Sequence, residues 1–420
     1  MEFLWKGKAI IPSTQQKTKC GPNNEENNMK RTNNVSLNTS WCLSAFCALA
    51  ILTPIGSSSA FAGDEQASGA VAASPNVVSV FATGLNNPRG LKFGPDGNLY
   101  VAEGGTGGSN STEGCCEPAA AVGPYTGSIT GSRISKIDAN GVRTTAVDNL
   151  PSSQTSAATG SLISGASDVA FMGNTLYILL GGAGCSHGVP QVPALPNGVI
   201  RVNADGTLDI IANLSAFQMA NPVRNPELKD FEPDGTWYSM VAVGSDRHDD
   251  NEGHGNLYAV DPNHGELDKI TGSGHISRIV DISASQGHIV PTAMTYHHGN
   301  FYVGNLGVFP IIDGSSKILK ITPSGQITVA AQGFTTVLGV AFDHMNRMYV
   351  LENTTGNPFP TPGTGDVVRV DHSGNRTIIA SGLFLPTAMT FGPDGALYVS
   401  NVGFGPPPVG MGQILRITVP

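Results

Sequence analysis

The chain has little charge for its length, and positive charge is the scarcer sign. Only 13% of its 420 residues are charged, and 23 Lys and Arg face 32 Asp and Glu, giving a net charge of −9. No cluster of Lys and Arg interrupts this balance, so the phosphate backbone of a nucleic acid would be repelled. We therefore expect no nucleic-acid partner.

Several motifs of catalytic and cofactor sites are also missing. The sequence contains no G-x-S-x-G elbow leading into a helix, no phosphate-binding loop and no dinucleotide fingerprint. It also lacks the C-x₂-C spacing of zinc sites built on cysteines. Beyond the N-terminal segment, no long stretch has the apolar spacing of a helix. Together with 53 Gly and 28 Pro, this favours an all-β protein of short strands and tight turns.

A repeated phrase is the strongest positive signal. The stretch from Pro88 reads PRGLKFGPDGNLYVAE, and the stretch from Pro386 reads PTAMTFGPDGALYVSN. Each predicts an antiparallel hairpin, because alternating apolar runs flank a Pro-Asp-Gly turn. Weaker copies begin at Ser167, Trp237, Pro291 and Val337, and each copy precedes a second hairpin with a small-polar-Gly turn.

Six copies of four strands predict a six-bladed β-propeller. The last copy lacks its fourth strand, whereas a spare strand over 76–85 precedes the first copy. Pairing this strand with 412–419 would close the ring and remove both exposed edges. A two-sheet β-sandwich is the alternative, but it leaves the complementary ends unexplained.

The segment before the repeats resembles a targeting signal. A basic start at 29–31, an apolar run over 41–52 and an Ala-Phe-Ala end at 60–62 are typical of a secretory signal peptide. The apolar run is too short for an ordinary transmembrane span, although an uncleaved anchor stays open as an alternative. We expect a secreted or periplasmic protein with no membrane span in the mature chain. The predicted division is a gene-start extension over 1–28, a signal peptide over 29–62, a flexible lead over 63–75 and the propeller over 76–420.

The predicted mature part keeps three cysteines: Cys115, Cys116 and Cys185. They lie in equivalent loops of the first two blades. In an oxidising compartment, Cys185 could form a disulfide with either member of the pair, which would leave one thiol over.

The propeller topology predicts where a functional site would lie. The start of the first strand, the end of the second and the long loop after the second strand share one face, and such loops carry function on rigid scaffolds. Polar residues end the second strands, and Arg89, Asp168, Thr292 and Thr387 open the first strands. Carboxylates and amides near the channel mouth could bind a hard cation such as Ca²⁺; alternatively, they cap strand ends. The ligand or metal candidates are Glu103, Asp261, His264, Asn305, Glu352 and Asn401.

Other polar residues are expected to be solvated. The segment 244–255, GSDRHDDNEGHG, is rich in Asp and His but matches no metal motif. It is expected to lie on the opposite face, as are His297 and His298, which are expected to face solvent.

The repeated phrase resembles that of NHL-type six-bladed propellers. More narrowly, FATGLNNPRGLKFGPDGNLYVAEGGTGG, the cysteine-bearing loop and PYTGSITGSRISKID resemble the ScyD/ScyE family, named after scytonemin-biosynthesis gene clusters. The resemblance covers residues 76–420 and implies an exported propeller. It supplies no catalytic residues.

A more distant resemblance links the chain to gluconolactonase-type propellers, which bind a divalent metal at the channel mouth. Their first blade opens with a carboxylate, whereas this chain has Arg89 there. We therefore expect a non-catalytic scaffold that binds a small molecule or a protein through the long-loop face. A link to scytonemin-type secondary-metabolite assembly rests on the resemblance, and a metal-dependent hydrolase or lactonase is the alternative.

Overall fold

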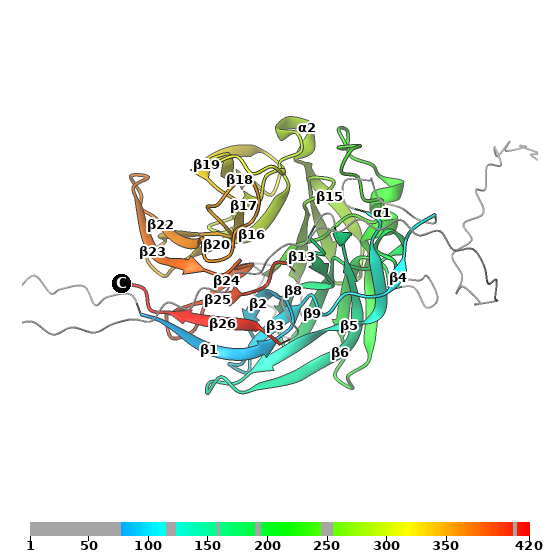
Figure 1. The fold of residues 1–420 in the computed structure, drawn as a ribbon, viewed down its shortest axis with the longest axis horizontal. Helices are drawn as coiled ribbons and strands as arrows, with labels where there is room; N and C mark the ends of the chain where they lie inside the picture. The colour runs from blue at the N-terminus through cyan, green and yellow to red at the C-terminus, as the bar shows by residue number, and fades with distance from the viewer. Residues whose placement is uncertain (1–76, 115–122, 158–159, 190–194, 245–254, 406–409) are drawn as a thin grey trace, which may run out of the picture. The chain divides into compact units, whose positions relative to one another are not determined.

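The computed structural model shows six antiparallel sheets arranged in a ring (Figure 1). It describes residues 77–420, except 115–122, 158–159, 190–194, 245–254 and 406–409. The predicted signal peptide and gene-start extension lie outside the described residues. Among the described residues, helices are short, and none has both the length and the apolar character needed to span a membrane.

The strands follow the predicted repeat. Blade 1 comprises β2 (Pro88–Phe93), β3 (Leu99–Glu103), β5 (Thr126–Ile137) and β6 (Arg143–Gln154). Two short strands extend it: β4 (Asn110–Ser111) pairs with β5, and β7 (Ile163–Ser164) pairs with β6. Blade 2 comprises β8 (Ala166–Met172), β9 (Thr175–Leu180), β10 (Gly198–Val202) and β11 (Leu208–Asn213). Blade 3 comprises β12 (Ser239–Gly244), β13 (Gly255–Asp261), β14 (Glu266–Thr271) and β15 (Ile276–Asp281).

The second half of the ring is equally regular. Blade 4 comprises β16 (Pro291–His297), β17 (Asn300–Asn305), β18 (Ser316–Ile321) and β19 (Ile327–Phe334). Blade 5 comprises β20 (Val337–Phe342), β21 (Met348–Glu352), β22 (Gly365–Val370) and β23 (Arg376–Leu383). Blade 6 comprises β24 (Ala388–Phe391), β25 (Leu397–Asn401), β26 (Gly412–Ile417) and the N-terminal β1 (Val78–Leu85). The short helices are α1 (Leu214–Ala220), α2 (Ser283–Gln286) and a 3₁₀ turn over Cys185–His187.

The ring closes as the sequence predicts. β1 pairs antiparallel with β26, so that Val78 lies opposite Ile417 and Leu85 lies opposite Gly412. The blue and red strands therefore lie side by side in Figure 1. This pairing covers the edge that β26 would otherwise expose.

The turns of the repeated phrase have the predicted chemistry. Gly97 and Gly395 adopt φ values of 77° and 73°, a region that glycine enters at little cost. The backbone N–H of Gly97 donates to the carbonyl of Gly94, which closes the turn.

The core consists of apolar layers between neighbouring sheets. Each of six buried clusters takes its residues from two adjacent blades; for example, Leu179 of blade 2 packs in the same cluster as Leu257 of blade 3. Every blade is therefore covered on both faces, which explains why strands such as β21 and β25 are buried throughout.

Blade 1 differs from the expectation at one point. The long loop expected after the second strand of this blade includes β4 and the first residues of β5, because β5 and β6 each extend to 12 residues. Gly127, Ser128 and Gly131 continue the pairing with β6 beyond the usual length of a third strand. The Gly- and Ser-rich composition of this stretch is also compatible with a loop, so the composition does not reveal the extension.

Candidate functional site

The long loops after the second strands share one end of the ring, which we call the loop face. It comprises the described residues of the segments 104–125, 181–197, 262–265, 306–315, 353–364 and 402–411. The opposite end carries the tight turns and is called the turn face.

Five of the six predicted site residues end the second strand of their own blade and are buried: Glu103, Asp261, Asn305, Glu352 and Asn401. Four of these side chains accept a backbone N–H from the link that enters the same blade. Glu103 accepts from Asn86 at 2.6 Å, Asp261 from Thr236 at 3.0 Å, Glu352 from Thr335 at 2.5 Å, and Asn401 from Phe384 at 2.9 Å. Asn305 instead donates to the carbonyl of Ile289 in its link at 3.0 Å. No described hydrogen bond or ion pair joins any two of the five side chains. The structure thus places them separately, each fixing the entry to its own blade.

The residues near the first-strand openings join neighbouring blades around the axis. Thr292 donates to the carbonyl of Val337 at 2.6 Å, and Thr387 donates to the carbonyl of Pro88 at 2.6 Å. Asp168 accepts the backbone N–H of Met240 at 2.8 Å, and burial raises the pKa of its carboxyl group. These polar side chains therefore link the innermost strands of adjacent sheets.

The axial space is small at this level. A cavity of about 30 Å³ is lined by residues of all six innermost segments, including Lys92 and Asp168. That volume holds one or two water molecules. Arg89 lies nearby, 6.0 Å from the centre of the Tyr238 ring. Burial raises the pKa of Tyr238 to about 12, although the positive charge of Arg89 opposes this shift.

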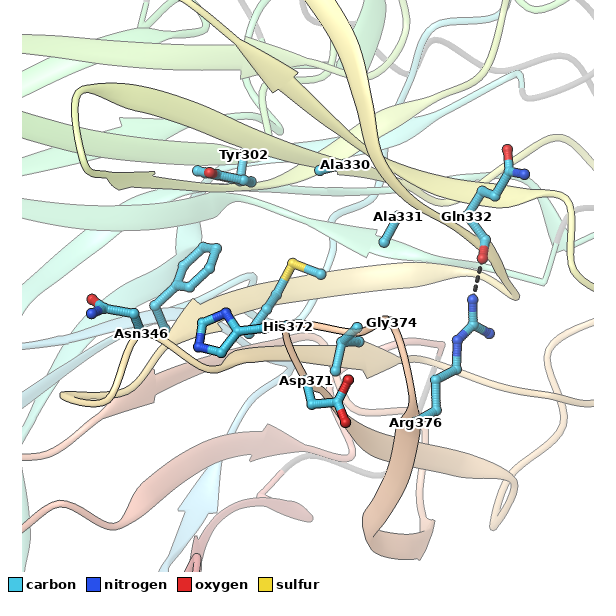
Figure 2. Close-up of a pocket in the computed structure, with 12 residues that line it drawn as sticks. Tyr302, Ala330, Ala331, Gln332, Asn346, Asp371, His372, Gly374 and Arg376 are labelled. Atoms are coloured by element: carbon cyan, nitrogen blue, oxygen red, sulfur yellow. Dashed lines mark hydrogen bonds between the residues drawn. The ribbon is translucent and has the colours of Figure 1, made fainter.

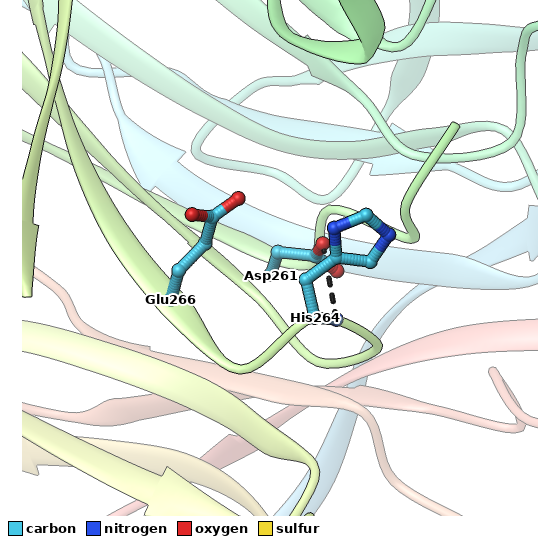
Figure 3. Close-up of side chains that lie close together, drawn as sticks. All are labelled: Asp261, His264 and Glu266. Carbon is cyan, nitrogen blue, oxygen red and sulfur yellow. Dashed lines mark hydrogen bonds between the residues drawn. The ribbon is translucent and has the colours of Figure 1, made fainter. Parts of the chain in front are cut away.

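In blade 3, three side chains form what we call the acidic cluster: Asp261, His264 and Glu266 (Figure 3). Asp261 ends β13 and Glu266 begins β14, and the four-residue turn between them sets the two residues directly opposite each other. His264 lies in this turn. One potential ligand atom from each residue lies within 4.8 Å of the others, and all three residues are at least 97% buried.

The partners of the acidic cluster come from α1, β15 and the link into blade 3, where Thr236 donates its backbone N–H to Asp261 at 3.0 Å. Gln218 of α1 donates through Nε2 to Asp261 and to Glu266, the latter at 2.8 Å. Arg278 of β15 forms an ion pair with Glu266. Burial raises the pKa of Glu266, and the positive charge of Arg278 opposes that shift.

A second buried group, which we call the polar network, adjoins the acidic cluster. It comprises Tyr125, Ser186, His187, Glu232 and Asp234, which come from the loop of blade 1, the loop of blade 2 and the link into blade 3. Glu232 is its centre, since it accepts the hydroxyl of Tyr125 at 3.0 Å and lies 3.1 Å from Nε2 of His187. Asp234 accepts both the backbone N–H and the hydroxyl of Ser186, at 2.8 and 2.6 Å.

The charge of Glu232 changes the protonation of its neighbours. Burial lowers the pKa of His187, but the negative charge of Glu232, 3.1 Å from Nε2, outweighs burial, so the pKa lies above its ordinary value. Burial and the charge of Glu232 together raise the pKa of Tyr125 well above its ordinary value. Tyr125 therefore stays a hydrogen-bond donor, and the network fixes three segments of the loop face relative to one another.

The loops of blades 4 and 5 are different, because they expose apolar side chains. The backbone N–H of Ile311 donates to the carbonyl of Pro358 at 2.8 Å, which joins the two loops. Around this bond lies what we call the apolar loop patch: Val308, Phe309, Ile312 and Phe359, exposed by 44%, 42%, 62% and 63%.

A larger cavity lies on the turn face, between blades 4 and 5 (Figure 2). It has a volume of about 420 Å³ and lies between β19 and the turn that joins β22 to β23. Two charged side chains that line it, Arg376 and Asp371, bind backbone groups of the propeller. Arg376 donates to the carbonyls of Gln332 and Gly333, and Asp371 accepts two backbone N–H groups of its own turn.

The remaining predictions have mixed outcomes. His298 is exposed as expected, but His297 is half-buried and its ring stacks on Phe342 at 4.0 Å, so the expectation of a solvent-facing His297 was wrong. Cys185 is disulfide-bonded, whereas Cys115 and Cys116 lie outside the described residues. The segment 245–254, which holds the charged residues of GSDRHDDNEGHG, also lies outside them.

Sequence reasoning found Asp261 and His264 but missed Glu266 and the polar network. Glu266 could have been predicted from the sequence, because the turn Pro-Asn-His-Gly after Asp261 places residue 266 opposite residue 261. Glu232 lies in an irregular link 107 residues from Tyr125, and no pattern in the chain relates them.

No family model and no curated protein sequence matches the chain. Among solved structures, a gluconolactonase from Xanthomonas campestris is 10% identical with a TM-score of 0.47, covering 82% of this chain and 90% of its own. Virginiamycin B lyase from Staphylococcus aureus is 13% identical with a TM-score of 0.44, covering 82% of this chain and 100% of its own. The calcium-binding protein regucalcin from Agrobacterium tumefaciens is 14% identical with a TM-score of 0.48, covering 82% and 94%. Similarity at this level concerns the chain path alone.

Proposed function

We propose that this chain is an exported, non-catalytic β-propeller that acts as a binding scaffold, and that its partner is a protein held at the loop face. The apolar loop patch is the observation that carries the proposal. Four large apolar side chains that are 42–63% exposed, in two loops joined by the bond between Ile311 and Pro358, are costly to leave in water, and such patches mark interaction sites.

A protein partner fits this patch better than a small molecule. Small ligands bind in concave pockets of about 300–1,000 Å³. Of the two cavities described above, the one of that size lies on the turn face, and the axial cavity is about 30 Å³. Projecting side chains such as Phe309 and Phe359 instead suit a second surface that can enclose them.

The polar network supports the same function. It holds the loops of blades 1 and 2 and the link into blade 3 through buried hydrogen bonds and one ion pair. A loop face ordered before binding loses less conformational entropy when a partner arrives. Such order is a property of scaffolds as well as of enzymes.

The alternative is a metal-dependent hydrolase of the gluconolactonase type. A catalytic metal needs an open coordination position for water or substrate. Among the described residues, the acidic cluster is the group of three potential metal ligands that lie close together, and its residues are at most 3% exposed. Burial of this kind favours the scaffold. A role in scytonemin-type secondary-metabolite assembly rests on the resemblance to the ScyD/ScyE family, and a deletion strain with unchanged metabolites would count against it.

The proposal is tested by photo-crosslinking in cells that export the protein. A photoreactive phenylalanine analogue at position 309 or 359 should give one discrete crosslinked protein. The same analogue at Ile378, which is 61% exposed on β23, is the matched control and should give none. Equal crosslinking at all three positions would overturn the proposal, as would lactone hydrolysis by the pure protein that Glu266→Gln abolishes.

A further inference from the structure

The acidic cluster contains a nitrogen lone pair that no hydrogen-bond donor satisfies. Nε2 of His264 lies 2.9 Å from the backbone carbonyl of Glu232. A carbonyl oxygen only accepts, so Nε2 must carry the hydrogen, and Nδ1 of the neutral ring is left with its lone pair. Nδ1 is buried and has no hydrogen-bond partner.

This lone pair lies beside two carboxylates. Figure 3 shows the His264 ring next to the Asp261 carboxylate, with Glu266 across from them. No ion pair joins the ring to either carboxylate in the described part of the chain, although the potential ligand atoms lie within 4.8 Å of one another. Two ligands of a tetrahedral first-row metal, each about 2.0–2.2 Å from it, are about 3.4 Å apart. The three potential ligand atoms lie within 4.8 Å of one another, so side-chain rotations alone would bring them to the separation of a shared cation.

The excess of negative charge around the acidic cluster also favours a bound cation. Asp268 follows Glu266 by two residues on β14, so both lie on the same side of the strand, and both carboxylate oxygens of Asp268 lack a hydrogen-bond partner. Its closest described cation is Arg278, whose Nε lies 4.0 Å from Oδ1. Arg278 thus faces an excess of buried carboxylates, and like charges set opposite each other on paired strands are destabilising.

We infer that Asp261, His264 and Glu266 bind one divalent cation of the first transition row, with Zn²⁺ as the best match. An imidazole nitrogen together with carboxylate oxygens suits Zn²⁺, whereas Ca²⁺ takes oxygen ligands. The hydrogen bond from Nε2 to the Glu232 carbonyl is the outer contact that metal-binding histidines typically make. Gln218 supplies the corresponding contact for both carboxylates.

This site is structural, because its three ligands are buried. The cation would join the turn after β13 to α1 through Gln218, and to the link into blade 3 through Glu232. The inference is independent of the proposed partner surface, since the apolar loop patch lies on blades 4 and 5.

The test is metal analysis of the full chain purified without chelator and dialysed against metal-free buffer. We expect one equivalent of Zn²⁺ per chain in the wild type and none in His264→Ala. Glu352→Gln, which changes a buried strand-end carboxylate in blade 5, should keep the metal. Gln218→Ala should weaken Zn²⁺ binding by roughly 10–100-fold, as the loss of an outer contact does.

Two further measurements separate this site from the charged segment 245–254 and from a folding defect. His248→Ala/His254→Ala removes the histidines of that segment, which lies outside the described residues, and should leave the metal content unchanged. If His264→Ala fails to fold, the wild type loaded with Co²⁺ should still show visible absorption typical of nitrogen and oxygen ligands. Wild-type protein that is folded, metal-free and unchanged in Tm by added Zn²⁺ would overturn the inference. So would a zinc content that survives in folded His264→Ala.

Discussion

The loops of blades 1–3 and those of blades 4 and 5 lie on the same face but are built in different ways. In blades 1–3, charged and polar side chains from separate segments turn inward and contact one another, with Glu232 at the centre. In blades 4 and 5, polar side chains such as Glu352 bind backbone groups, and apolar side chains such as Phe359 face outward. One half of the loop face is thus closed by its own polar contacts, whereas the other half presents a surface that a partner can cover.

The largest expected effect lies in the closed half. Glu232→Ala should lower the free energy of unfolding by about 3–5 kcal/mol, because it leaves His187 and the Tyr125 hydroxyl buried without their acceptor. Urea denaturation followed by fluorescence measures the change. A loss below about 1 kcal/mol would contradict the view that Glu232 organises this half.

The pH dependence of the closed half has a definite sign. The pKa of His187 is raised in the folded protein, so its stabilising contribution is complete below the unfolded pKa of 6.5 and is lost as pH rises through the folded pKa. The difference in unfolding free energy between wild type and His187→Gln should therefore shrink above pH 6.5, by at most about 1.4 kcal/mol per pH unit. Parallel urea titrations from pH 5.5 to 9 test this, and a difference that grows with pH would reverse the assignment.

A single strand-end residue in the other half should matter less. Glu352→Ala removes the acceptor of one backbone N–H, that of Thr335, and should lower the free energy of unfolding by about 1–3 kcal/mol. The comparison with Glu232→Ala uses the same urea titration. Equal losses of unfolding free energy in the two variants would contradict the view that polar contacts stabilise the loops of blades 1–3 more than those of blades 4 and 5.

The smallest effect on stability is expected at the apolar loop patch. Phe309→Ser and Phe359→Ser should change the free energy of unfolding by no more than about 0.5 kcal/mol, because both side chains are largely exposed. They should nevertheless abolish capture of the protein that crosslinks at these positions. A clear loss of unfolding free energy in either variant would show that the apolar loop patch stabilises the propeller instead of binding a partner.

The fold could be predicted from the sequence because its turns repeat. Pro-Asp-Gly flanked by alternating apolar runs specifies one hairpin, and Gly97 and Gly395 occupy the same turn position 298 residues apart. The pairing of β1 with β26 was predictable, because the last copy of the repeat lacked a fourth strand and one strand preceded the first copy. The extension of β5 and β6 in blade 1 was less clear, because Gly127 and Gly131 belong to a composition found in loops and strands alike.

The candidate site could be predicted only where residues are close in the sequence. Asp261 and His264 share one turn with Glu266, so a register argument reaches all three. Tyr125 and Glu232 meet because an irregular loop and an irregular link happen to approach each other, and no period relates them. Exposure of Phe309 and Phe359 is also a tertiary property, since an apolar residue in a loop can equally turn inward, as Ile311 does with 8% exposure.

The pairing of β1 with β26 has a consequence for biogenesis. β1 leaves the ribosome before every other described strand, but it can pair only after β26 has been made, because Val78 lies opposite Ile417, 339 positions further along the chain. Five blades can assemble while the polypeptide is still growing, but β1 keeps an unpaired edge throughout. A nascent chain stalled shortly before residue 412 would therefore hold an open arc of blades, and the synthesis of β26 completes the ring.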